Sequence, residues 1–274
     1  MKFANNLTIS SYTLGTTVSL YDRIHIAAES GFTGIGLRVE NYMEALAAGF
    51  TDAHILALLK KYHLKVTEIE LLTDWGANSD RTPDQQKKEQ LLFHMARLFK
   101  VKHINATLFQ SFSEKQMISA LKNLCIRAEE LDIAIEFMPY SSFPTLQTVW
   151  RVIQQSECQN AKIICDAWHW TRAHQSPENL ENIPADRIVA IQVDDAHRLP
   201  YKNLRQESRH DRLPAGSGSN ETIVMLHALK TLGVQPRVIS TEMLSDRIMS
   251  KGLLYTAKTS YTAAQKIIKQ HWDT

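Results

Sequence analysis

Cysteine is scarce in this chain, and its pattern excludes two kinds of crosslink. The three cysteines, Cys125, Cys158 and Cys165, are an odd number and contain no Cys-x-x-Cys pair. A disulfide framework is expected to use an even set, and a thiolate zinc site to use closely spaced pairs. We therefore interpret all three as reduced thiols with a structural role.

Long apolar runs and an excess of charge of one sign are also missing. No stretch approaches the roughly 18 apolar residues of a membrane span, and the N-terminal Met-Lys-Phe-Ala-Asn-Asn-Leu lacks the apolar segment of a signal peptide. The 31 Lys and Arg residues are scattered among 29 Asp and Glu residues, which leaves a formal net charge of +2. These absences argue against a membrane or a nucleic acid as the main partner. We expect a cytoplasmic protein that binds a small molecule.

Glycine-rich loops that cradle nucleotide phosphates are absent too. No Gly-x-Gly-x-x-Gly follows the first candidate strand, and no Gly-x-x-x-x-Gly-Lys-Ser/Thr occurs anywhere. Dinucleotide chemistry is therefore not indicated.

The sequence does contain a regular alternation of short β-branched segments with longer segments of helical period, which is typical of repeated βα units. The candidate strands are Leu7–Tyr12, Gly34–Val39, Lys65–Leu71, His103–Leu108, Ala134–Met138, Lys162–Asp166, Val189–Val193 and Arg237–Thr241. The candidate helices are Leu20–Ser30, Ala53–Tyr62, Pro83–Phe99, Glu114–Leu131, Leu146–Gln155, Pro177–Glu181, Glu221–Thr231 and Asp246 to the C-terminus, with Ser245 as an N-cap and Gly31 and Gly233 as helix ends. This pattern favours one α/β domain over residues 1–274, a closed (β/α)8 TIM barrel, with a doubly wound open sheet as the alternative.

Polar residues close four strands in the second half of the chain. Strands of a parallel barrel are buried on both faces and should be almost wholly apolar, so a polar residue at the end of one needs a reason. The four residues are Glu136, Asp166, Gln192 and Glu242. Because strand ends meet at one mouth of a barrel, we expect these side chains to converge.

Three convergent carboxylates repel one another, and a divalent cation resolves the conflict. Three carboxylates and one amide oxygen form a hard ligand set, which favours Mg²⁺, Mn²⁺ or a similar ion. The alternative is that each carboxylate caps a helix or pairs with an arginine. Asp194 and Asp195 compete with Gln192 for the place of a ligand, and strand alternation puts Asp194 on the same face as Gln192.

The segment after the seventh strand is basic. Arg209, His210 and Arg212 lie beside Gly216 and Gly218, and this composition suits recognition of an anion or a polyol. The alternative is a solvated basic loop.

Other polar and aromatic residues are weaker candidates. Glu70 is a candidate substrate contact, whereas Glu68 on the same strand face is expected nearer the barrel bottom. Trp75 and Trp168 either pack against a sugar ring in the site or pack in the core. Arg38 either contacts substrate or forms a structural ion pair. Three histidines are interpreted as surface or packed residues; they are His25, His94 and His227.

Together these motifs resemble the xylose isomerase-like TIM-barrel superfamily of sugar isomerases and epimerases. The resemblance rests on Glu136-Phe-Met-Pro, Asp166-x-x-His169, Gln192-Val-Asp-Asp-Ala and Glu242. It implies that Glu136, Asp166, Gln192 and Glu242 hold one divalent metal ion, and that His169 contacts substrate. Many relatives have His at the place of Gln192, and Gln there is similar to the 3-dehydroshikimate dehydratase branch, as is the Ser208-Arg209-His210-x-Arg212 block.

The resemblance implies an isomerase or epimerase that acts on a sugar or related polyhydroxy ketone. Glu136 and Glu242 would be both ligands and acid/base groups, with His169 as a further catalytic group and Glu70, Arg209, His210 and Arg212 as substrate contacts. A dehydratase of the 3-dehydroshikimate type is the main alternative. Metal-dependent endonuclease relatives share the barrel, but they need several histidine ligands and a basic DNA-facing surface, which are not evident here. A non-catalytic sugar-binding barrel and a homo-oligomer are further possibilities.

Overall fold

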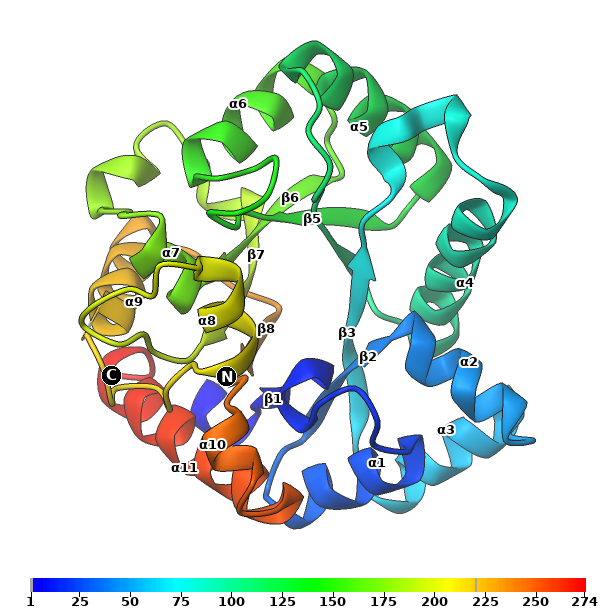
Figure 1. The fold of residues 1–274 in the computed structure, drawn as a ribbon, viewed down its shortest axis with the longest axis vertical. Helices are drawn as coiled ribbons and strands as arrows, with labels where there is room; N and C mark the ends of the chain where they lie inside the picture. The colour runs from blue at the N-terminus through cyan, green and yellow to red at the C-terminus, as the bar shows by residue number, and fades with distance from the viewer. Residues whose placement is uncertain (1, 220) are drawn as a thin grey trace.

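Eight parallel strands form a closed barrel in the computed structural model, which describes residues 2–219 and 221–274 (Figure 1). Each strand pairs with its neighbour in the sequence, and β8 pairs with β1 to close the ring. The strands are β1 (Thr8–Ile9), β2 (Gly34–Arg38), β3 (Lys65–Leu72), β4 (His103–Ala106), β5 (Asp132–Glu136), β6 (Ala161–Asp166), β7 (Ile188–Val193) and β8 (Val238–Thr241). The predicted (β/α)8 barrel is thus confirmed and the open sheet is excluded.

Helices surround the barrel on its outside (Figure 1). They are α1 (Leu20–Glu29), α2 (Val39–Ala47), α3 (Asp52–Lys61), α4 (Pro83–Phe99), α5 (Glu114–Ala128), α6 (Leu146–Ser156), α7 (Ala167–Arg172), α8 (Leu204–His210), α9 (Glu221–Leu232), α10 (Asp246–Met249) and α11 (Leu253–His271). Several begin at a Ser or Thr whose side chain accepts a hydrogen bond from the first helical turn, as at Thr51, Thr82, Ser113 and Thr145. None of the helices in the described residues combines the length and the apolar composition needed to cross a bilayer.

The structure differs from the sequence prediction mainly at the C-terminal ends of the strands. β1 is only two residues long, because Ser11–Leu14 turns into a 3-10 helix. Three short helices, α2, α7 and α8, follow strands where no helix was predicted. Pro177–Leu180 forms only a 3-10 turn.

The predicted C-terminal helix is also divided. It breaks into α10, which ends at Met249, and α11, which begins after Gly252 with its φ of 104°. Ser245 precedes α10 as predicted, but its side chain makes no capping hydrogen bond. Gly31 and Gly233 do have positive φ at helix ends, as predicted.

Strand register explains why the polar strand ends meet. Inside the barrel, Ala134, Ile164, Ala190 and Val238 pack in a small apolar cluster. Side chains on one face recur every second residue, so the next layer above this cluster holds Glu136, Asp166, Gln192 and Ser240. The C-terminal half of the barrel interior is therefore polar, and this layer forms the floor of the site described below.

A buried ion-pair cluster joins α4 and α5. Glu89 accepts hydrogen bonds from Arg127 (Nε, 2.7 Å) and Arg81 (Nη1, 2.6 Å), and its side chain is only 4% exposed. Burial raises the pKa of Glu89, but hydrogen bonds and charge from Arg127 and Arg81 outweigh burial and lower the pKa below its usual value. Glu89 is therefore the shared anion of two arginines from different segments.

Replacing Glu89 with glutamine is expected to lower the free energy of unfolding by about 3 kcal/mol, because it leaves two guanidinium groups without a countercharge, one of them buried. Urea denaturation measures the change. Glu130→Gln is the matched control, since Glu130 also pairs with an arginine (Arg97, 3.0 Å) but in solvent, and a much smaller loss is expected there. Equal losses in the two variants would contradict the assignment.

Candidate active site

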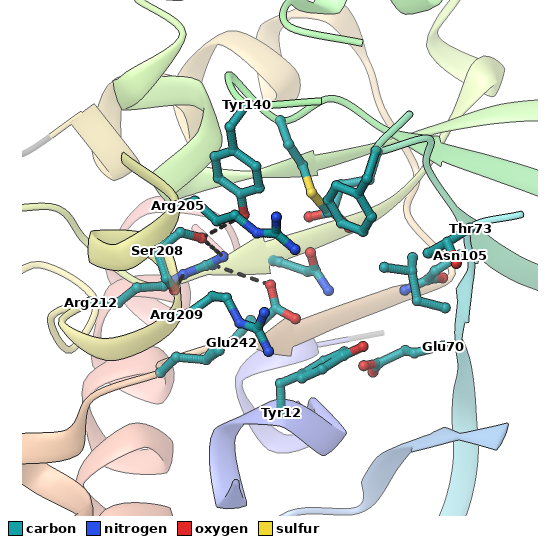
Figure 2. A pocket seen from close by; sticks show the side chains of 16 residues that line it. Tyr12, Glu70, Thr73, Asn105, Tyr140, Arg205, Ser208, Arg209, Arg212 and Glu242 are labelled. Carbon is teal, nitrogen blue, oxygen red and sulfur yellow. Dashed lines mark hydrogen bonds and ion pairs between the residues drawn. The ribbon is translucent and has the colours of Figure 1, made fainter. Parts of the chain in front are cut away.

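A cavity of about 140 Å³ opens at the C-terminal ends of the strands (Figure 2). Its walls come from four strands of the barrel (β3, β4, β5 and β7), from segments that follow strands and from α8. The lining residues are Tyr12, Glu70, Leu71, Thr73, Asn105, Phe109, Glu136, Met138, Tyr140, Gln192, Arg205, Ser208, Arg209, Arg212, Glu242 and Leu244. Three of the four predicted metal ligands, Glu136, Gln192 and Glu242, thus face one space.

Asp166, the fourth predicted ligand, lies fully buried beneath the cavity surface. It ends β6 and caps α7, because its Oδ1 accepts the backbone N–H of His169 at 2.8 Å. Its Oδ2 accepts a hydrogen bond from Arg212 Nη1 at 2.9 Å. The sequence alternative of helix capping and arginine pairing is therefore realised at Asp166.

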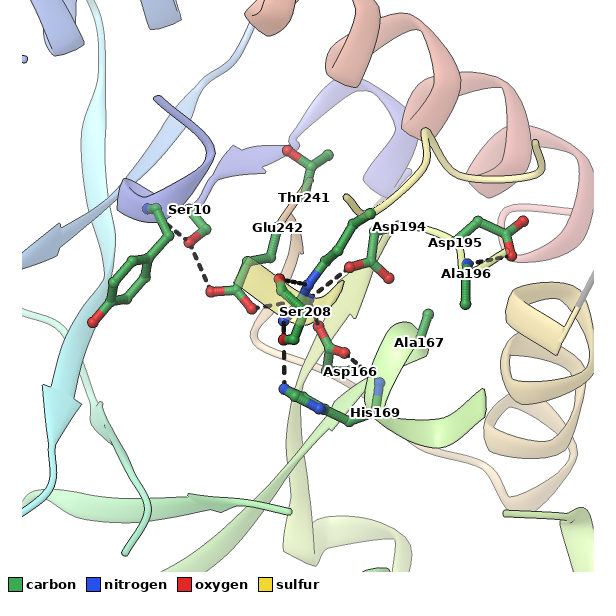
Figure 3. Close-up of polar contacts among 12 residues, drawn as sticks. Ser10, Asp166, Ala167, His169, Asp194, Asp195, Ala196, Ser208, Thr241 and Glu242 are labelled. Atoms are coloured by element: carbon green, nitrogen blue, oxygen red, sulfur yellow. Dashed lines mark hydrogen bonds and ion pairs between the residues drawn. The ribbon is translucent and has the colours of Figure 1, made fainter. Parts of the chain in front are cut away.

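Arg212 is the cation at the centre of the acidic cluster. Its Nη1 lies 2.6 Å from Asp194, 2.9 Å from Asp166 and 3.2 Å from Glu242, and Figure 3 shows these three carboxylates converging. Burial lowers the pKa of Arg212, but the three carboxylates outweigh burial and raise the pKa well above its usual value. Arg212 is therefore a permanent countercharge for residues that the sequence assigned to the metal.

One guanidinium does not neutralise the whole cluster. Burial, followed by the charge of Asp166, raises the pKa of Glu136 to about 8 against the opposing effect of Arg212. Burial also raises the pKa of Glu242 to about 8, with Arg212 opposing and Glu136 and Asp166 reinforcing the change. The site thus has more carboxyl groups than its own cation can keep ionised.

The donor atoms suit a metal ion. Oε1 of Gln192 and Oδ1 of Asp194 are buried and accept no hydrogen bond from the described residues. Glu136, Asp166 and His169 each offer a ligand atom, and these atoms lie within 4.8 Å of one another. A divalent cation would satisfy these oxygens and offset the excess negative charge. The cluster includes His169 and does not include Glu242, whose Oε2 faces Arg212.

His169 is fully buried and does not line the cavity. Its Nε2 lies 3.3 Å from Glu136 Oε1 and 3.4 Å from Arg212 Nη2, and its ring contacts Trp168 and Tyr140. Burial lowers its pKa to about 4, with Asp166 opposing this change, so the imidazole is neutral near pH 7. A neutral imidazole suits a metal ligand or a hydrogen-bond partner better than a proton donor.

Glu70 completes the acidic side of the cavity. Ser10 links it to Glu242, because the Ser10 hydroxyl lies 3.3 Å from Glu70 Oε2 and 3.2 Å from Glu242 Oε1. On neighbouring β2, a Cβ added at Gly36 would lie 2.2 Å from Glu70 Oε1, so glycine leaves room for this carboxyl group in its present position. Glu68 lies deeper in the barrel, where burial raises its pKa to about 8.

The predicted substrate contacts on α8 and after it separate in the structure. Arg209 and Arg212 line the cavity, whereas His210 does not. His210 is exposed, and its Nδ1 lies 3.0 Å from Asp246 at the surface. This happens because the segment is a helix, in which consecutive residues point in different directions.

The remaining sequence candidates have packing or surface roles. Trp75 is buried against Phe143, and its indole N–H donates to the Thr107 carbonyl oxygen at 3.1 Å. Trp168 is buried beneath the guanidinium groups of Arg172 and Arg212. Arg38 lies over the Tyr12 ring. His25, His94 and His227 are at the surface, and the three cysteines are free, as predicted.

Sequence reasoning missed Arg205 and the aromatic wall of the cavity. Tyr12, Phe109 and Tyr140 line the cavity, but none of them is a charged or amide residue at a strand end, which was the signal used to find site residues. Arg205 lies four residues before Arg209, so a helical interpretation of this segment would have placed both on one face.

Comparisons with known proteins agree with this architecture. A 3-dehydroshikimate dehydratase of Pseudomonas putida is 28% identical over 102 residues, which are 37% of this chain and only 16% of that protein. The IOLI protein, crystallised with a zinc atom, superposes with a TM-score of 0.86 at 17% identity over 98% of this chain and 100% of that one. D-allulose 3-epimerase from Methylomonas sp., in complex with D-allulose, gives 0.71 at 14% identity over 99% of each chain.

These two structural likenesses show the fold alone, because the identities are low. A family model described as xylose isomerase-like TIM barrel matches residues 24–271, which is most of the chain. This chain therefore belongs to the xylose isomerase-like TIM-barrel family.

Proposed function

We propose that the chain is a divalent-metal-dependent isomerase or epimerase that acts on a polyhydroxy ketone. One observation carries this proposal: Glu136, which ends β5, and Glu242, which directly follows β8, line the same cavity although these strands are not neighbours. Two carboxyl groups at different places around one substrate can remove a proton from carbon and return it elsewhere, which is what isomerisation or epimerisation requires.

The metal would be held by Glu136, Asp166, Gln192 and Glu242, with His169 in contact with the same cluster. When bound, such an ion stabilises negative charge on substrate oxygens next to the carbon that loses a proton. Arg212 orients Asp166 and Glu242 through the contacts of 2.9 and 3.2 Å given above. Tyr12, Phe109 and Tyr140 form the apolar and hydroxyl-bearing wall against which a sugar packs.

Proton exchange in D₂O tests the proposal. The metal-loaded protein is incubated with a panel of ketoses, and NMR follows deuterium at the carbons next to the carbonyl group. We expect deuterated epimers or aldoses to form without loss of water. If no ketose shows deuterium exchange or forms an epimer or aldose, the proposal is wrong.

Dehydration of a 3-dehydroshikimate-like substrate is the second candidate, favoured by the 28% identity to the Pseudomonas putida enzyme. Dehydration requires an acid near the leaving oxygen, and the sequence analysis predicts a catalytic role for His169. Because His169 is buried, neutral and outside the cavity lining, the geometry favours the isomerase or epimerase. Formation of an ultraviolet-absorbing aromatic product from 3-dehydroshikimate would reverse this order.

Replacing His169 with alanine is expected to lower turnover by roughly 10²-fold while metal content stays near one per chain, because the imidazole orients Glu136 and Arg212 from behind. Elemental analysis and steady-state kinetics measure the two quantities. His94→Ala, at an exposed histidine, is the control. Loss of metal together with turnover would make His169 a ligand instead.

A further inference from the structure

Helix α8 presents two arginines to the cavity. Arg205 and Arg209 are four residues apart, so they lie one turn apart on the same face of the helix. Both line the cavity, both are exposed, and Figure 2 shows their guanidinium groups projecting into it. They form its outer part, whereas Arg212 lies buried below.

Neither arginine has a carboxylate partner among the residues that the structure describes. The acidic residues nearest to them in the chain are already bound to other groups. Glu207 accepts hydrogen bonds from Arg172 and from the Tyr201 backbone, and Asp211 lies 3.0 Å from His197 and accepts from the Tyr201 hydroxyl group. The donors of Arg205 and Arg209 are therefore available to a ligand.

Arg205 contacts the aromatic wall of the cavity without using these donors. Its guanidinium group lies 5.4 Å from the centre of the Phe109 ring, and Phe109 stacks on Tyr140 with the planes 8° apart. The Tyr140 hydroxyl group in turn lies 2.9 Å from Ser208 Oγ on α8. A guanidinium group over an aromatic ring keeps its N–H groups free for a ligand.

The cavity consequently has two chemically different ends. Glu70, Glu136 and Glu242 make the inner end acidic and suited to a cation and hydroxyl or oxo groups, while the charged lining residues of the outer end, in the part of the chain that the structure describes, are Arg205 and Arg209. A neutral polyol matches the inner end alone. A carboxylate or phosphate group matches the outer end, because its oxygens accept paired hydrogen bonds from guanidinium groups.

We propose that Arg205 and Arg209 bind an anionic group, carboxylate or phosphate, at one end of a polyhydroxy substrate. The position of the opposite, oxo-bearing end of the substrate at Glu136 and Glu242 rests on the proposed function. The preference for an anion does not depend on the proposed function.

Calorimetric titration of the metal-loaded protein tests this preference with three compounds of equal chain length: D-glucitol, D-gluconate and D-glucitol 6-phosphate. We expect at least one of the two anions to bind roughly tenfold or more tightly than D-glucitol, as expected for charge-assisted hydrogen bonds. Whichever anion binds more tightly identifies the group as carboxylate or phosphate. Raising the salt concentration to about 1 M is expected to shrink the preference.

The double variant R205Q/R209Q is expected to lose the preference while it binds D-glucitol as the wild type does. R247Q is the matched control, because Arg247 on α10 is exposed and does not line the cavity, and it is expected to keep the preference. Equal binding of all three compounds to the wild type, or no measurable binding of any of them, would overturn the proposal. A preference for the anion that survives in R205Q/R209Q would also overturn it. An intact preference in a protein that shows no proton exchange with any substrate would instead count against the proposed function.

Discussion

Replacing Arg212 with methionine is expected to lower the free energy of unfolding of the metal-free protein by about 3–5 kcal/mol. The reason is the loss of the one guanidinium group that Asp166, Asp194 and Glu242 share inside the barrel. Methionine roughly preserves the length of the side chain but leaves these carboxylates facing one another without a countercharge. Urea denaturation in the presence of a chelator measures the effect.

Two comparisons separate charge from packing in this experiment. Arg209→Met removes the same group three residues earlier, at an exposed position, and is expected to change stability little. Adding a divalent metal to R212M is expected to restore part of the lost stability, because a bound cation takes over the compensation. An R212M protein as stable as the wild type would contradict the role of Arg212 as countercharge.

Replacing Glu242 with glutamine is expected to lower turnover by about 10²–10⁴-fold, because it removes one of the two carboxyl groups proposed to move the proton. Folding stability is not expected to fall, since the change removes a carboxyl group whose pKa burial already raises. Steady-state kinetics and thermal unfolding measure the two effects. Glu181→Gln, an exposed change, controls for the loss of one negative charge.

A Glu242→Gln protein that keeps most of the wild-type turnover would remove Glu242 from the proton transfer. The pairing of lost turnover with retained stability is the informative result, because a structural role for Glu242 would change both quantities together.

The barrel was predictable because its signal is periodic and repeated. Eight apolar segments separated by helical stretches leave few other folds, and Glu136, Asp166 and Gln192 stand out as polar residues at or near the C-terminal ends of β5, β6 and β7. The convergence of Glu136, Gln192 and Glu242 on one cavity then follows from the geometry of any parallel barrel.

The countercharge and the rim of the cavity were less predictable. The sequence places Arg212 near the site but does not show that its guanidinium group lies buried between three carboxylates, because that depends on how the segment after β7 folds back. The helix over Leu204–His210 contains little apolar periodicity, so it was interpreted as a loop, and Arg205 was missed as a result. Short helices at strand ends are held by tertiary contacts, such as Glu207 with Arg172, more than by local preference.

The close approach of β2 to the Glu70 side chain restricts which residues related proteins can carry at position 36. Because the Glu70 carboxyl group occupies the space of a Cβ at position 36, a mutation of Gly36 would force that carboxyl group to shift. A residue larger than glycine at position 36 therefore requires the Glu70 side chain to move or to be replaced by a smaller one. The two positions are expected to covary among related sequences, with glycine at one marking the lineages that retain a carboxylate at the other.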